Sequence, residues 1–122
     1  MAHERQRQYL WTLDEGGNPR PERNVLRWAK WLEGAGEART VAQTELPGGR
    51  IVSTVFLGID HNFSFHGPDV ERLPVLWETM VFRADGKGWG VQRRYQSRED
   101  ALAGHQSIVE ELTQKRHERK LR

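Results

Sequence analysis

The chain has 122 residues and no cysteine, a size typical of one domain and a composition that excludes disulfides, iron–sulfur clusters and thiolate zinc sites. Its 19 basic and 17 acidic residues give a formal net charge of +2, which argues against strong nonspecific binding to nucleic acid. It has no apolar run long enough to span a membrane and no signal-peptide core, so we expect a cytoplasmic protein that forms a single domain over residues 1–122, with a frayed basic tail at 115–122.

The N-terminal third of the chain predicts a strand followed by a helix. Residues 8–13 alternate loosely and end at the turn signal of residues 14–18, which is typical of a short edge strand. Asn18, with prolines after it, predicts a helix start, and Gly34 and Gly36 predict its end. We expect the packed face of this helix to contain Val25, Leu26, Trp28, Ala29 and Leu32.

The middle of the chain predicts a hairpin and then a long loop. Residues 39–46 and 50–59 are rich in β-forming residues and are separated by a short connection that contains two glycines. The second of these strands is apolar on both faces, so we expect it to be central in the sheet. Residues 58–74 predict an irregular loop, and loops of that length in compact domains are usually functional or mobile.

The C-terminal third predicts a second hairpin and a long helix. Residues 74–83 and 89–96 form the expected strands, and Ser97 with Asp100 three residues later predicts a helix start. The order β-α-β-β-β-β-α predicts an α+β fold with an antiparallel sheet of about five strands, on which an N-terminal helix and a long C-terminal helix pack. We expect the buried stripe of the last helix to contain Ala101, Leu102, His105, Ile108, Val109 and Leu112.

Two residues on expected core faces carry ionisable groups. If Leu76, Met80 and Phe82 face the core, the period of a strand places Glu78 on the same face, where an unpaired carboxylate is costly. Glu78 therefore forms an ion pair with an arginine of a neighbouring strand, such as Arg94, lies at an edge position that is not buried, or contacts a ligand.

His105 lies in register with the buried stripe of the last helix. It is either a satisfied core histidine or it converges with Glu78, Asp60 and His61 on one pocket. Such groups can ligate a metal or transfer protons, but the chain has no HExxH or similar spacing. We therefore predict no metal site, no catalytic site and no cofactor.

The long loop and the last strand supply the other candidate contacts. His61, Asn62 and Phe63 suit stacking on a flat polar ligand, although phenylalanines of this loop can also close the core. Adjacent arginines in a strand point to opposite faces, so one of them, with Arg83 across the hairpin, forms either an anion site or a solvated basic face. The ligand-binding residues that we predict are His61, Asn62, Phe63, Glu78, Arg93, Arg94, Tyr95 and His105.

Four segments between residues 53 and 105 carry a family resemblance. They read STVFLGIDHNF, WETMVF, RRY and EDALAGH, and with them the chain resembles a family of short phage and prophage proteins over about residues 38–110. Residues 64–73 are longer and less glycine-rich than this family leads us to expect. In size, order of elements and residue types the chain is also similar to the anti-Thoeris sponges. Those are small phage proteins that sequester cyclic nucleotide signals of host immune enzymes, typically at subunit interfaces.

The resemblance implies a non-enzymatic phage anti-defence protein in the host cytoplasm that binds and sequesters a nucleotide-type immune signal. One alternative is an anti-CRISPR-like inhibitor that binds a host defence protein, with Trp11, Trp31 and Trp89 as exposed contact anchors. Nucleic-acid binding through the basic C-terminus and a small hydrolase using His61, Glu78 and His105 are the others. We expect a homo-oligomer, because sheet edges need covering, and no nucleic-acid or membrane partner.

Overall fold

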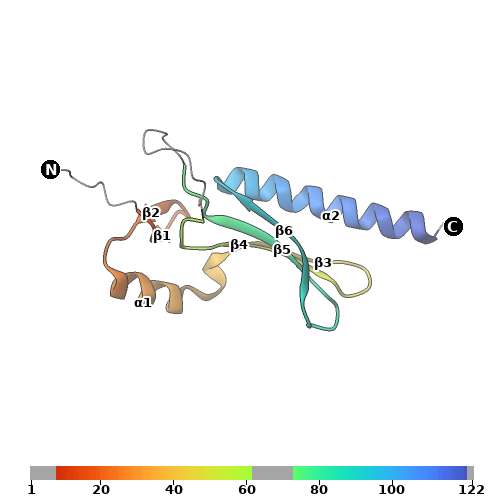
Figure 1. Ribbon diagram of the computed structural model, residues 1–122, viewed down its shortest axis with the longest axis horizontal. Helices are drawn as coiled ribbons and strands as arrows, with labels where there is room; N and C mark the ends of the chain where they lie inside the picture. Colours follow the sequence, from red (N-terminus) through yellow and green to blue (C-terminus); the bar gives the residue numbers. More distant parts are fainter. Residues whose placement is uncertain (1–7, 62–72, 121–122) are drawn as a thin grey trace.

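The computed structural model describes residues 8–61 and 73–120. These residues form an α+β fold, as predicted, with a two-stranded and a four-stranded antiparallel sheet and two α-helices (Figure 1). In this part of the chain no helix is both long and apolar enough to cross a membrane. In chain order the elements are β1 (Trp11–Leu13), β2 (Pro19–Pro21), α1 (Val25–Ala35), the 3-10 helix η1 (Gly36–Arg39), β3 (Thr40–Glu45), β4 (Ile51–Phe56), β5 (Trp77–Phe82), β6 (Trp89–Tyr95) and α2 (Arg98–Lys120).

The four-stranded sheet has the order β3-β4-β5-β6, so β4 and β5 are central and β3 and β6 form its edges. The two predicted hairpins are confirmed. The connection between β3 and β4 needs its glycines, because Gly48 and Gly49 have φ angles of 100° and 96°, a region that other residues rarely adopt. The backbone N–H of Leu46 donates to the carbonyl of Arg50 at 2.7 Å and closes this turn.

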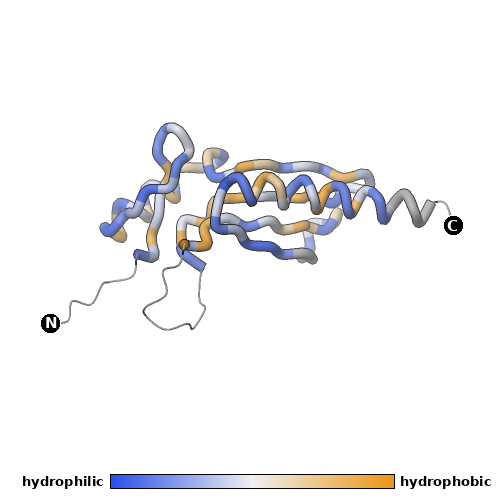
Figure 2. Tube along the Cα trace, turned by 90° about the horizontal axis from the view of Figure 1, so that it is seen from above, coloured by the Kyte–Doolittle hydropathy of each residue, from blue (hydrophilic) through white to orange (hydrophobic). Residues whose placement is uncertain are grey.

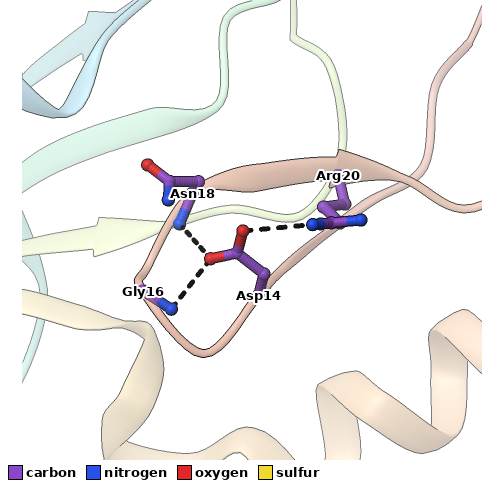
Figure 3. Close-up of polar contacts among 4 residues, drawn as sticks. All are labelled: Asp14, Gly16, Asn18 and Arg20. Carbon is purple, nitrogen blue, oxygen red and sulfur yellow. Dashed lines mark hydrogen bonds and ion pairs between the residues drawn. The ribbon is translucent and has the colours of Figure 1, made fainter.

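The prediction of one sheet of about five strands is wrong, because β1 pairs with β2 instead of joining the large sheet. The turn between them is built on Asp14, whose Oδ1 accepts hydrogen bonds from the backbone N–H groups of Gly16 and Asn18, both at 2.9 Å (Figure 3). The hydrogen bond from Asn18 is the main cause that lowers the pKa of Asp14. Pro19 and Pro21 have no N–H to donate, which suits them to the short edge strand that they occupy.

The first helix begins later than predicted, at Val25, because the asparagine that caps it is Asn24 and not Asn18. The Oδ1 of Asn24 accepts from the backbone N–H of Arg27 at 3.0 Å, a standard N-cap bond. The helix ends, as predicted, at a glycine: Gly36 adopts a φ of 50°.

The packed face of α1 also differs from the prediction. Val25 and Leu26 are 61% and 82% exposed, and Ala29 is exposed too. The half-buried stripe starts at Trp28 and continues through Trp31 and Leu32, the i, i+3, i+4 spacing of one helix face. The ring of Trp31 packs edge-on against Phe56, with centroids 6.0 Å apart, and so attaches α1 to the end of the large sheet.

The long helix α2 lies along one face of the large sheet, while α1 lies beyond the end of the sheet beside β1 and β2 (Figure 1). Figure 2, which looks from above, shows α2 extending lengthwise over the strands. The Oγ of Ser97 accepts from the backbone N–H of Asp100 at 3.0 Å, which confirms the predicted start of this helix. Its stripe is buried as predicted except at Leu102, which is 39% exposed, and at Val109, which is half-buried. The fraying of residues 115–122 stays a prediction.

The core lies between α2 and the alternate residues of β4 and β5 that point toward it. On β5 these are Trp77, Thr79 and Val81. The expectation that Met80 and Phe82 face the core is therefore wrong, and Glu78 shares their face, whereas Leu76 is buried in the core as expected. We call this side the helix-covered face and the opposite side the open face. The buried apolar residues of the core are Leu46, Val52, Phe56, Leu76, Trp77, Val81, Ala101, Ile108 and Leu112.

Candidate functional site

The open face carries a patch of polar and apolar side chains from three strands. The register of the sheet places Glu78 of β5 between Val55 of β4 and Arg94 of β6. Because side chains of a strand alternate between faces, the next row on the same face contains Ser53, Met80 and Gln92. We call the six residues Ser53, Val55, Glu78, Met80, Gln92 and Arg94 the open-face patch.

Glu78 is the buried centre of this patch, with only 8% of its side chain exposed. Its Oε2 accepts hydrogen bonds from Arg94 Nε at 2.9 Å and from Gln92 Nε2 at 2.5 Å. The ion pair with Arg94 is therefore the one that the sequence predicts. A carboxylate removed from water at this depth needs such partners, because its lost hydration is otherwise uncompensated.

His61 lies in the segment that follows β4, five residues after Phe56. Its backbone N–H donates to the carbonyl of Val75 at 2.9 Å, and the Oδ1 of the buried Asp60 accepts from the N–H of Val75 at 2.9 Å. Burial lowers the pKa of the His61 imidazole, and the positive charge of Arg94 lowers it further, while the carboxylates of Glu78 and Asp60 oppose the shift. The charges of two members of the open-face patch, Glu78 and Arg94, therefore act on His61.

His105 lies on the other side of the sheet, under α2, where it is 4% exposed. Its Nδ1 is 2.8 Å from the hydroxyl of Thr54, and its Nε2 is 2.9 Å from the hydroxyl of Thr44. Thr54 in turn bonds the hydroxyl of Thr79 at 2.5 Å, so the network links three strands to the helix. Burial lowers the pKa of His105. His105 is therefore a satisfied core histidine, and it shares no pocket with Glu78.

Arg93 and Tyr95 also point to the helix-covered face. Arg93 forms an exposed ion pair with Glu111 of α2, Nη2 to Oε2 at 3.4 Å, with 45% of each side chain exposed. The ring of Tyr95 packs directly on Gly104 of α2. Among the described residues, the buried polar side-chain atoms without a hydrogen-bond partner are the Tyr95 hydroxyl and the Nε1 of Trp77, which lies opposite Tyr95 in the sheet.

The eight predicted ligand-binding residues therefore divide into three groups. Glu78 and Arg94 bond each other at the open face, and both charges influence the pKa of His61. Arg93, Tyr95 and His105 lie on the helix-covered face, so they do not join that site. Asn62 and Phe63 lie outside the described residues.

Other partners in both polar clusters were not predicted from the sequence. Gln92 reaches Glu78, and Thr44, Thr54 and Thr79 bond His105 or one another. Their only sequence signal is alternation: Gln92 is two residues from Arg94 and so shares its face. Arg83, expected to share a sheet face with Arg93 or Arg94, pairs with Asp85 at 3.5 Å in the turn after β5.

The arrangement at the open face offers hydrogen bonds and charge more than it offers reactivity. No group of three or more metal-ligating side chains is found within residues 8–61 and 73–120. The patch presents one carboxylate, one guanidinium and one carboxamide beside the half-buried apolar side chains of Val55 and Met80. Such a surface can bind a flat ligand that has both polar edges and an apolar ring face.

Comparison of the chain with protein-family models, with curated proteins and with solved structures found no match.

Proposed function

We propose that this chain is a non-enzymatic binding protein that holds a nucleotide-type ligand on the open-face patch. Nucleotide binding and the resemblance to short phage proteins together lead us to propose that the chain is an anti-defence protein, which sequesters a nucleotide immune signal of the host. Catalysis is not part of the proposal, because the carboxylate of the patch is paired with a guanidinium.

The observation that carries the proposal is the ion pair between the buried carboxylate of Glu78 and the partly exposed guanidinium of Arg94, on a face that no described helix covers. Fold stability alone does not require a charged pair here, since apolar residues of similar volume usually stabilise a buried position at least as well. Charged groups kept at positions where apolar residues would be at least as stabilising are common where a protein recognises a ligand. The pair therefore supports a binding role for this part of the open face.

Three members of the patch have a direct role in the proposed complex. The guanidinium of Arg94, with 39% of its side chain exposed, contacts the phosphate or the base edge, since its planar fork suits such acceptors. The side chains of Val55 and Met80 offer apolar surface for one face of the base.

The test is a titration by calorimetry and thermal shift with nucleoside monophosphates, cyclic di- and trinucleotides and cyclic ADP-ribose isomers. We expect one of them to bind with micromolar affinity or better, to raise the melting temperature by mass action, and to be recovered unchanged after heat release. If no nucleotide binds, the proposal is wrong. If the ligand is recovered chemically altered, the protein is an enzyme and the non-enzymatic assignment fails.

The chain supplies a matched pair of control variants in two adjacent arginines. Arg94→Gln removes the guanidinium of the patch, and we expect a loss of affinity of at least about tenfold. Arg93→Gln makes the same chemical change on the opposite face, where Arg93 pairs with Glu111, and we expect unchanged affinity. Equal losses in both variants would place the ligand elsewhere. Binding is measured well below the melting temperature of each variant.

A second candidate function is inhibition of a host protein by direct binding. Of the predicted anchors, Trp11 and Trp31 are half-buried and pack in the core cluster of Phe56, and the side chain of Trp89 is outside the described ones. What favours this function instead is the exposure of Val25 and Leu26, adjacent apolar residues on α1. Leu26→Glu would then abolish co-purification with the host protein and leave nucleotide affinity unchanged.

A further inference from the structure

The carboxylate of Glu78 retains hydrogen-bonding capacity that the fold does not use. An ionised carboxylate has about four acceptor sites, about two on each oxygen. Both donors, from Gln92 and Arg94, bond the same oxygen, Oε2, and within the described part of the chain Oε1 accepts no hydrogen bond. The side chain of Glu78 is 8% exposed, and Oε1 is not among the buried atoms without a partner in the described residues.

The guanidinium of Arg94 has free capacity next to this oxygen. It uses Nε for Glu78, and its two terminal amino groups bond to none of the described residues. An anionic acceptor therefore lies beside a forked cationic donor. The complementary ligand edge has N–H donors next to a carbonyl acceptor, so that each group meets its opposite.

We propose that the patch reads the base of its ligand and selects guanine, an inference that rests on the nucleotide-binding function proposed above. The base-pairing edge of guanine presents, in order, the 2-amino group, N1–H and the carbonyl O6, so two adjacent donors are followed by an acceptor. The two donors fill the free acceptor sites of Glu78 Oε1, and O6 accepts from Arg94.

The other bases lack this sequence of groups. Adenine and cytosine each present one donor group, followed by a ring nitrogen acceptor that repels a carboxylate. Uracil presents one N–H between two carbonyls. Each of them therefore leaves an acceptor site of Glu78 unfilled or brings an acceptor toward its charge, and unfilled polar sites weaken binding strongly.

The experiment measures the affinity of the full chain for GMP, AMP, CMP, UMP and ribose 5-phosphate by calorimetry at one salt concentration. We expect GMP to bind at least about tenfold more tightly than any other nucleotide, as one bidentate contact discriminates between bases. Ribose 5-phosphate reports the contribution of the phosphate and sugar alone. The variant Glu78→Gln, checked for folding by its melting temperature, should lose most of the preference for GMP and little of its affinity for AMP.

The outcomes separate the two proposals. Equal affinity for all four nucleotides, or a preference for another base, overturns guanine selection and leaves the nucleotide-binding function in place. A preference for GMP that persists in Glu78→Gln overturns the role of this carboxylate. Binding by none of the compounds here or in the cyclic nucleotide titration overturns both proposals.

Discussion

The two faces of the large sheet bury polar groups in different ways. On the helix-covered face, both ring nitrogens of His105 are bonded to threonine hydroxyls, so the network is closed. On the open face, the Glu78–Arg94 pair leaves Oε1 and the terminal amino groups without a partner among the described residues. A closed network fixes how a helix packs on a sheet, whereas a network with free donors and acceptors can bind a ligand.

The comparison predicts that the same truncation lowers the free energy of unfolding by different amounts on the two faces. The largest loss is expected for Phe56→Ala. Phe56 is 0% exposed and packs against Trp31 and Trp77, with ring centroids 6.0 and 5.5 Å away. Its truncation leaves a cavity, so we expect a loss of about 3–5 kcal/mol in the free energy of unfolding. Urea denaturation monitored by circular dichroism measures it.

The matched control is Phe82→Ala, which removes the same atoms on the open face. Phe82 is 38% exposed, so we expect roughly 1–2 kcal/mol, since solvent and neighbours fill part of the space. Equal losses at the two positions would mean that the open face is packed as tightly as the core. That result would argue against a free ligand surface there.

The contact between α2 and β6 predicts a second, smaller effect on stability. Alanine substitutions at two helical glycines, one inside this contact and one outside it, measure the effect. A Cβ on Gly104 would overlap the ring of Tyr95, whereas a Cβ on Gly34 of α1 would meet no atom within 4 Å. Alanine is favoured over glycine in helices, so Gly34→Ala should stabilise the protein by up to about 1 kcal/mol. Gly104→Ala should instead destabilise it by about 1–3 kcal/mol through overpacking.

A double-mutant cycle isolates the cause of the Gly104→Ala effect. In a Tyr95→Ala background the overlapping ring is absent, so the added methyl group should be neutral or stabilising. If Gly104→Ala costs as much without the ring as with it, close packing of Tyr95 on α2 does not explain the glycine.

Local signals in the sequence predicted most elements of this fold. The glycines of the hairpin turns, the cap at Ser97 and the helical period from Ala101 to Leu112 each act over a few residues, and each was predicted correctly. The N-terminal region was not, because Asn18 and Asn24 carry the same capping signal. Only the Asp14 turn, which returns the chain as β2, decides between them.

The orientation of β5 shows why the site was only partly predicted. Both alternating sets of this strand contain large apolar residues, and the buried set is interrupted by Thr79, a polar residue at 0% exposure. Hydrophobicity alone therefore favoured the wrong face. The Glu78–Arg94 pair was still predicted, because cross-strand neighbours share a face whichever way the strand is turned.

The smallest expected effect is a pH dependence that arises on the helix-covered face. Burial lowers the pKa of His105 below its ordinary 6.5, so the unfolded chain takes up a proton at higher pH than the folded chain does. Stability should therefore fall as the pH drops below about 6.5, by at most about 1.4 kcal/mol per pH unit for one proton, until the folded-state pKa is passed. Above that range His105 adds no pH dependence.

The variant His105→Gln separates this contribution from that of His61, whose pKa is also lowered. Glutamine keeps an amide that can bond to Thr44 or Thr54 but has no proton to gain, so its stability should fall less between pH 7.5 and pH 5.5. Urea denaturation at the two pH values measures the difference. Identical pH dependence in both proteins would mean that His105 is protonated in place, with both threonine hydroxyls accepting from it, and that the closed network tolerates the charge.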